Sequence, residues 1–172
     1  MALQINDTTA IIRRITNLIQ GNSDWCMGVW IQASYMPLGP NYLTCISKQN
    51  VGYSAWAGIY SSNLGPVFDN PFEINVDNGG GASDTADAVI ETNLAHLGYR
   101  KEGANHLFYR DGTLIGNVVE DMSAVTFFEM LLGNDRNNII LGPIKFFDFF
   151  EYNIAKSVNT ILFQMGIIGR PV

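Results

Sequence analysis

The sequence predicts an all-β fold in which antiparallel strands pack as a sandwich of two sheets. Side chains alternate in character from His96 to Lys101 and again from His106 to Arg110, and the turn-forming residues 102–105 separate the two runs. Asp111-Gly112 follows directly, and this dipeptide supplies the positive φ angles that a two-residue hairpin loop needs. The composition agrees with a β-rich protein, because the 172 residues include 17 Gly and are 12% aromatic but only 15% charged.

The two turns predict three consecutive strands joined as hairpins. Across the second turn, Arg110 and Thr113 are expected to face each other. Strict alternation assigns side chains to faces, with Leu107 and Tyr109 on one and His106, Phe108 and Arg110 on the other. Each strand can therefore bury one side and leave the second in contact with solvent.

Two interpretations are open for residues 9–20. Their apolar residues recur near a three-to-four spacing, which is compatible with an amphipathic helix. β-branched Ile and Thr nevertheless fill most of the segment, and we therefore predict strands. The run from Trp25 to Ala33 alternates clearly and is typical of a central strand in a sandwich. One face carries Met27, Val29 and Ile31, and the other carries Cys26, Trp30 and Gln32.

Strand-like alternation becomes sparse after residue 61 in the middle of the chain. Strands are predicted at 44–48 and 53–61, with a turn at 49–52. From Ser62 to Asp87 only one short strand, 72–76, is visible in a stretch dense with Asn, Asp, Gly and Ser. Loops of this length are usually functional or mobile.

Acidic side chains in this stretch raise the question of a Ca²⁺ site. Asp69, Asp77 and Asp84 are weak candidates, because carboxylate oxygens are the hard ligands that Ca²⁺ takes. Their spacing is not that of an EF-hand, and a solvated, turn-rich loop is the favoured interpretation. Apart from this candidate cation, the sequence indicates no cofactor.

The last third predicts further strands and a short C-terminal helix. Residues 117–120 are expected to complete one strand, and further strands are expected at 126–132, 139–141 and 144–152. Ser157 is a suitable N-cap for a helix through Gln164, and Gly166 is a suitable residue to end it.

Several of these runs carry a family resemblance. Residues 93–100 (NLAHLGYR) followed by 107–116 (LFYRDGTLIG) resemble the central signature of laminin G-like domains of the concanavalin A-like jelly-roll superfamily. Residues 25–34, 43–48 and 142–153 resemble other strands of that family, in the same order. The resemblance implies a single jelly-roll domain over residues 1–172, a pair of strands at the N-terminus and a short helix after the last strand. It also implies binding as the general class of function.

No residue pattern of an enzyme is present. Glycosidases of this fold need alternating carboxylates on one strand, because two acids about 5 Å apart act as nucleophile and acid. Glu73 and Asp77 are four residues apart, and Glu120 and Asp121 are adjacent, so the sequence argues against glycoside hydrolysis. The Gly-rich run 79–81 lacks the Lys-Ser/Thr of a phosphate loop.

His96 and His106 are the two histidines of the chain, and they lie on neighbouring predicted strands. A third metal ligand is absent from the local sequence. We therefore predict that His96 is a half-buried strand residue and His106 an exposed residue at the edge of a turn.

Aromatic side chains on strands offer a candidate carbohydrate site. Trp56, Tyr60 and Tyr99 are the candidates, because amphipathic rings on a curved sheet can stack on sugars. Most strand aromatics belong to the core, which is the alternative for each of the three.

Charge and cysteine content exclude several classes of partner. The net charge of −6, with no basic block longer than Arg13-Arg14, argues against a nucleic-acid partner. No apolar run reaches the roughly 18 residues of a membrane-spanning helix, and no secretory signal is visible, so synthesis in the cytoplasm is expected. Cys26 and Cys45 are then better explained as buried thiols than as a disulfide.

Two functional hypotheses follow. The first is a non-catalytic structural protein, such as a decoration or accessory subunit on the exterior of a phage virion or similar assembly, which works as an oligomer through contacts with other subunits. A low share of charged residues fits a surface that is covered by a partner, although a large core would produce the same composition. The second is a lectin-like carbohydrate-binding module, with or without Ca²⁺.

Overall fold

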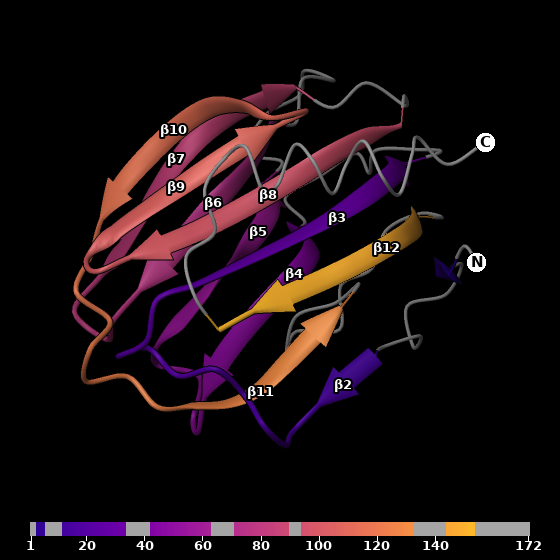
Figure 1. The fold of residues 1–172 in the computed structure, drawn as a ribbon. Coiled ribbons are helices and arrows are strands. Elements are labelled where there is room, and N and C mark those ends of the chain that lie inside the picture. Colours follow the sequence, from indigo (N-terminus) through magenta and orange to yellow (C-terminus); the bar gives the residue numbers. More distant parts are fainter. Residues whose placement is uncertain are drawn as a thin grey trace.

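The computed structural model describes residues 3–5, 12–33, 42–62, 71–89, 94–132 and 144–153, which form two antiparallel six-stranded sheets packed against each other (Figure 1). Sheet A is ordered β1 (Leu3–Ile5), β12 (Ile144–Tyr152), β3 (Trp25–Ala33), β8 (Ala95–Glu102), β9 (Asn105–Arg110) and β10 (Thr113–Val119). Sheet B is ordered β2 (Ile12–Arg14), β11 (Phe127–Leu132), β4 (Tyr42–Asn50), β5 (Trp56–Ser62), β6 (Pro71–Asp77) and β7 (Ala82–Val89). The predicted all-β sandwich is confirmed.

The predicted double hairpin forms one side of sheet A. Arg110 pairs with Thr113, and Asp111 and Gly112 both have positive φ angles, of 48° and 80°. The Asp111 carboxylate also accepts a hydrogen bond of 3.0 Å from the backbone amide of His96 on β8. The turn thus has the backbone that an Asp-Gly hairpin requires, and the Asp side chain ties it to the next strand.

The hydrophobic core lies between the sheets and follows the predicted alternation. On β3, Met27, Val29 and Ile31 are fully buried in the core cluster, while the intervening side chains point to the outer face of sheet A. Sheet B contributes Ala57 and Ile59 from β5. Other core residues from the two sheets include Trp25, Ile46, Phe72, Ile74, Val76, Leu97, Tyr99, Phe108, Phe127, Met130 and Leu132.

Two expectations need correction. Residues 82–87, expected within a loop, belong to strand β7 (Ala82–Val89), which pairs with β6 through a short turn at 78–81. Pairing with a formed neighbour supplies the backbone hydrogen bonds that its polar sequence does not itself specify. Strands were expected over residues 9–20; in the part of that segment that the structure describes, 12–20, Ile12–Arg14 forms strand β2 and residues 15–20 continue without regular structure.

Some expectations fall on residues that the structure does not describe. These are the C-terminal helix from Ser157 to Gln164, the strand at 139–141 and the candidate ligand Asp69. Cys26 is present as a thiol, fully buried in β3 of sheet A. Cys45 belongs to β4 of sheet B.

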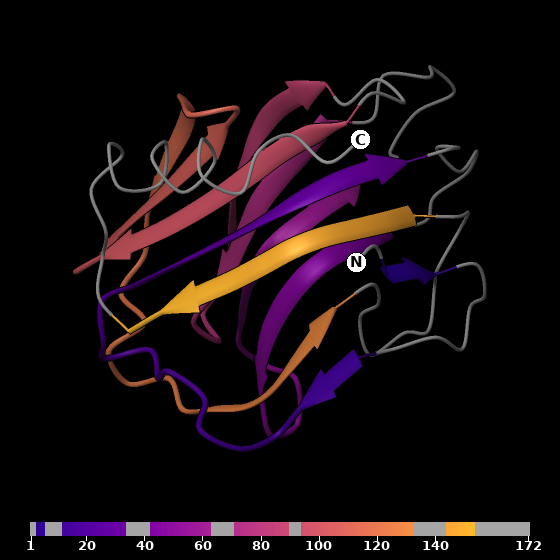
Figure 2. The same cartoon turned by 45° about the vertical axis from the view of Figure 1, so that its right-hand side comes forward.

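Five short segments gather at one end of the sandwich, which we call the turn end (Figure 2). They are residues 15–24 before β3, 51–55 between β4 and β5, 78–81 between β6 and β7, 103–104 between β8 and β9, and 120–126 before β11. Contacts between them come from residues far apart in the sequence, such as the hydrogen bond of 3.2 Å from the Gly21 amide to the Val125 carbonyl. The turn end therefore exists only in the folded chain.

Candidate binding site

Trp56 and Tyr60 lie on the outer face of sheet B. They alternate along β5 with the core residues Ala57 and Ile59, and cross-strand alternation points them away from the core. Trp56 is half-buried, and its Nε1 donates a hydrogen bond of 2.5 Å to Oδ1 of Asn75 on β6. Tyr60 is only 8% exposed. Of the two, Trp56 has the ring that is better placed to contact a ligand.

Tyr99 is a core residue and cannot stack on a sugar at the surface. Its side chain is fully buried, and its ring packs edge-on against Trp25 with the centroids 4.7 Å apart. Burial raises the pKa of its hydroxyl well above the usual value. Alternation along β8 could have identified this position, because Tyr99 shares its strand face with Leu97.

The carboxylate of Asp77 stabilises a turn. Its Oδ1 accepts hydrogen bonds from the backbone amides of Gly79 at 2.7 Å and Gly81 at 3.3 Å. Asp84 lies on β7 opposite Asn75. Within the described ranges, no three His, Cys, Asp or Glu side chains lie together in a way that could hold a metal ion. The Asp77 geometry is that of a capped turn between β6 and β7.

The two histidines lie on opposite faces of sheet A. His96 is 1% exposed on the outer face, where its ring meets Trp30 edge-on at 5.4 Å. His106 points into the core with no exposed surface, which corrects the expectation of an exposed turn residue. Burial lowers the pKa of each to about 4. Both are therefore neutral at pH 7.

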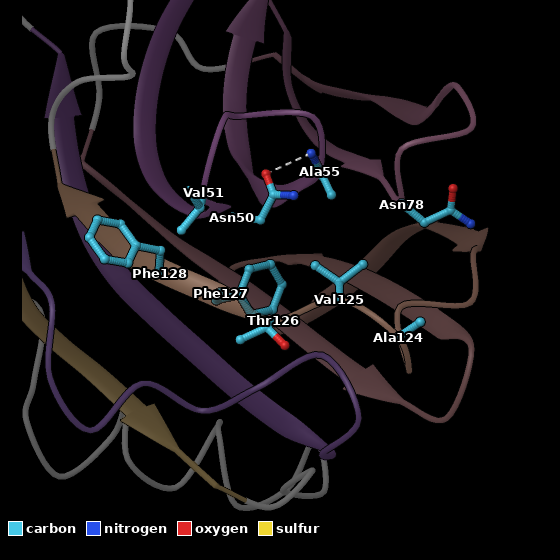
Figure 3. A pocket seen from close by; sticks show the side chains of 9 residues that line it. All are labelled: Asn50, Val51, Ala55, Asn78, Ala124, Val125, Thr126, Phe127 and Phe128. Atoms are coloured by element: carbon cyan, nitrogen blue, oxygen red, sulfur yellow. Dashed lines mark hydrogen bonds between the residues drawn. The ribbon is translucent and has the colours of Figure 1, made fainter.

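An open pocket of ≈ 420 Å³ lies at the turn end (Figure 3). It is assembled from the turn after β4, the turn after β6 and the segment that leads into β11. Its lining consists of Asn50, Val51, Ala55, Asn78, Ala124, Val125, Thr126, Phe127 and Phe128. None of these side chains titrates near neutral pH, so the pocket has no acid, base or strong nucleophile for catalysis.

Two apolar side chains of the pocket are strongly exposed. Val51 is 72% exposed and Phe128 is 47% exposed, and they lie toward one side of the pocket in Figure 3. Phe128 is exposed because it directly follows Phe127, which faces the core, and the register of β11 with β4 shifts between Phe127 and Glu129. The sequence signal was the adjacent pair Phe127-Phe128, because two consecutive strand residues cannot both face one core.

The amide side chains of the pocket are engaged in the turns. Asn50 accepts a hydrogen bond of 3.0 Å from the Ala55 amide and donates one of 3.1 Å to the Ser54 hydroxyl. Asn78 accepts from the Gly80 amide at 2.9 Å and donates to the Asp121 carbonyl at 3.4 Å. The pocket is thus held in shape by its own polar groups, and polar and apolar atoms contribute nearly equal shares of its surface.

Similar bonds hold the rest of the turn end. The Gln20 side chain accepts from the Phe127 amide at 2.7 Å and donates to the Phe127 carbonyl at 3.3 Å. The Asp24 carboxylate accepts from the Gly103 amide at 2.7 Å, and the Asp121 carboxylate accepts from the Ser123 amide at 2.9 Å. A surface that is ordered before binding loses little conformational entropy when a partner arrives.

A buried ion network lies behind the pocket. The Lys48 ammonium, with a fully buried side chain, is 2.5 Å from one carboxylate oxygen of Glu151, and Arg14 is 2.8 Å from the other. Lys48 also lies 4.1 Å from the centroid of the Trp25 ring. Burial lowers the pKa of Lys48, and the negative charge of Glu151 opposes that shift. The network joins both sheets to the N-terminal segment and does not line the pocket.

Comparison with known proteins finds similarity at the level of the fold. No protein-family model and no curated protein sequence matches the chain. Among solved structures, the receptor-binding domain of botulinum neurotoxin C/D mosaic serotype aligns with a TM-score of 0.76 at 13% identity, over 96% of this chain and 42% of that one. The binding domain of botulinum neurotoxin serotype D aligns with a TM-score of 0.75 at 13% identity, again over 96% and 42%.

A third structure concerns botulinum neurotoxin type C, whose cell entry depends on interaction with two ganglioside molecules. It aligns with a TM-score of 0.73 at 10% identity, over 98% of this chain and 43% of that one. The chain spans less than half the length of these structures. No helix able to cross a membrane occurs in the described parts of the chain. This chain therefore shares the β-sandwich fold of binding domains from botulinum neurotoxins.

Proposed function

We propose that this chain is a non-catalytic binding protein that acts through its surface, as an accessory or decoration subunit on the exterior of a larger assembly such as a phage virion. The observation that carries the proposal is the turn end, where a preformed pocket without charged groups exposes Val51 and Phe128. Exposed apolar side chains beside a rigid recess are typical of protein contact sites.

The pairing of buried charged side chains in the described parts of the chain also supports a non-catalytic role. The buried acids and bases that the structure places together, such as Lys48 and Glu151, pair with each other behind the pocket. The laminin G-like resemblance and the fold shared with toxin binding domains favour binding as the class of function. In this proposal the chain forms a single domain over residues 1–172 and assembles on a virion.

The test is to isolate the tagged protein from the cells or particles in which it is made, and to identify the proteins that remain bound. We expect stoichiometric binding to a large assembly through an interface above about 1,000 Å². Loss of the bound proteins in Phe128→Asp, with normal binding by the surface control Leu114→Asp, is the expected pattern. A wild-type protein that binds no assembly would overturn the proposal.

Glycan binding is the second candidate, favoured by the half-buried Trp56 on the outer face of sheet B. The botulinum neurotoxin structure that aligns with this chain belongs to a toxin that interacts with gangliosides. A glycan array with and without a chelator tests it. Selective binding that Trp56→Ala abolishes and Phe128→Ala retains would establish a sugar site on sheet B, and sensitivity to the chelator would establish Ca²⁺ dependence.

A further inference from the structure

We infer that residues 154–172 turn back from the end of β12 and dock on the outer face of sheet A. The area that they cover, which we call the outer patch, consists of Cys26 and Trp30 on β3, His96 on β8 and Tyr109 on β9. The occupant of this face is thus a segment of the same chain.

The outer patch is buried although it points away from the core between the sheets. Cys26 and His96 have at most 1% of their surface exposed, and Tyr109 and Trp30 at most 5%. In an antiparallel sandwich the outer face of a sheet is open to solvent unless another segment lies on it. The burial therefore requires a covering segment.

The sheet itself does not supply this cover. Gly28 and Gly98 pair with each other in the middle of the patch, and Gly98 pairs in turn with Tyr109. Glycine has no side chain, so this row contributes nothing that could shield its neighbours. Leu114 on β10 lies opposite Tyr109, on the same face, yet it is 52% exposed. The cover therefore ends between β9 and β10.

Strand direction identifies the segment that can reach the whole patch. The last residue of β12, Tyr152, pairs with Cys26 near the turn end. Residues 154–172 therefore leave sheet A beside one corner of the patch. Every other stretch of more than two residues outside the described ranges joins strand ends at the opposite end of the sandwich, namely residues 6–11, 34–41, 63–70, 90–93 and 133–143.

The sequence of the C-terminal segment has the pattern of an amphipathic helix. Within and just after the helix predicted over 157–164, apolar side chains recur at i, i+3, i+4 and i+7, which are Val158, Ile161, Leu162 and Met165. This spacing places the four side chains on one face of a helix. An apolar face of this kind needs a surface to cover it, and the outer patch is such a surface.

The lengths of the helix and of the patch agree. Residues 157–164 span about 12 Å as an α-helix. Cys26 and Trp30 mark the extent of the patch along β3, and their separation of four residues corresponds to about 13 Å. A helix that lies along β3 therefore reaches both. With sheet A covered by its own chain, the turn end and the outer face of sheet B are the surfaces left for partners.

The test is disulfide trapping in the full chain, with Cys45→Ala so that Cys26 is the remaining native thiol. Val158 is the apolar position of the predicted helix nearest to the end of β12, so Val158→Cys should form a disulfide with Cys26 under mild oxidation. Thr160→Cys is the matched control, because Thr160 lies about 200° around the helix. Its crosslinking, followed by intact mass and peptide mapping, should be at least tenfold slower.

Reactivity of the Cys26 thiol gives an independent measurement. In native Cys45→Ala protein, iodoacetamide should alkylate Cys26 slowly. Leu162→Asp places a charge on the docked face and should accelerate the reaction at least tenfold, whereas Gln164→Asp, on the other face, should leave it unchanged. Circular dichroism and thermal unfolding establish that each variant is folded.

Equal crosslinking by Val158→Cys and Thr160→Cys would overturn the inference, as would equal alkylation rates in folded Leu162→Asp and Gln164→Asp. If Leu162→Asp does not fold, the crosslinking comparison decides the question. Neither measurement involves a partner. Failure here therefore leaves the proposed function standing, and a chain that binds no assembly leaves the docking of residues 154–172 intact.

Discussion

The hydroxyl of Tyr99 donates a hydrogen bond of 2.6 Å to Nδ1 of His106, and both side chains are fully buried between the sheets. The other ring nitrogen of His106, Nε2, lies 2.9 Å from the carbonyl oxygen of Glu120. A carbonyl oxygen only accepts hydrogen bonds, so Nε2 carries the ring proton and Nδ1 accepts from Tyr99. The core thus contains a neutral histidine with both nitrogens satisfied.

Tyr99→Phe should destabilise the protein by about 1–3 kcal/mol, because it leaves Nδ1 of His106 buried without a partner. Chemical denaturation at pH 7 measures the change. Tyr109→Phe is the matched control, since Tyr109 is 4% exposed on the next strand, opposite Gly98, and lies on the outer face. Its stability should stay close to wild type. Equal losses in the two variants would contradict the assigned bond.

The folded protein should lose stability as the pH falls from about 6.5 to about 4. Burial lowers the pKa of both His96 and His106 from 6.5 to about 4, so the unfolded chain binds more protons in this window. The contribution is fully present above pH 6.5, and each histidine accounts for a loss of up to about 3 kcal/mol. Urea unfolding between pH 6 and pH 5, above the range of ordinary carboxylates, measures the slope.

The neutral replacement His106→Gln provides the control for this pH effect. Its stability at pH 7 should be lower, because Gln fits the site less well, but its decline with falling pH should be about half as steep. A wild-type midpoint that does not change across this window would show that the histidines are not buried in neutral form.

Glu151→Gln should cost about 3–5 kcal/mol, because it leaves the charge of Lys48 buried without compensation. Arg14→Gln removes the other ion pair of Glu151, but the Arg14 side chain is 39% exposed, so the loss should not exceed about 1 kcal/mol. The double variant Lys48→Met/Glu151→Gln should be more stable than Glu151→Gln alone. A double-variant cycle by denaturant unfolding tests this order, and additive losses would refute the coupling.

Gly58→Ala should destabilise sheet B, whereas Gly98→Ala should be tolerated. A Cβ at Gly58 would collide with the Ile46 carbonyl oxygen and lie 2.6 Å from Cε2 of Tyr60. At Gly98, the nearest atom to a new Cβ is Cβ of Tyr109 at 3.5 Å, an ordinary contact. Overpacking of this kind costs about 1–3 kcal/mol. Comparable melting temperatures for the two variants would contradict the packing around Gly58.

Local pattern was sufficient wherever one strand or one turn carries its own signal. Asp111-Gly112 predicts the hairpin because only a few residues accept the positive φ angles that the turn requires. The last described strand was predicted with its observed bounds, Ile144–Tyr152, and alternation on β3 identified the core face. For these elements the information is contained within about ten residues.

The sequence by itself therefore determined the all-β class, the central hairpins and the face of β3 that forms the core, because side-chain period and turn chemistry are local properties. Only the tertiary structure decided that Tyr99 and His106 meet in the core, that β7 pairs with β6, and that the pocket forms. That pocket joins residues near 50, 78 and 126. These residues approach each other only when strands β11, β4, β5 and β6 of sheet B pair in the correct register. Contacts of this kind depend on the packing of whole sheets, which no single segment encodes.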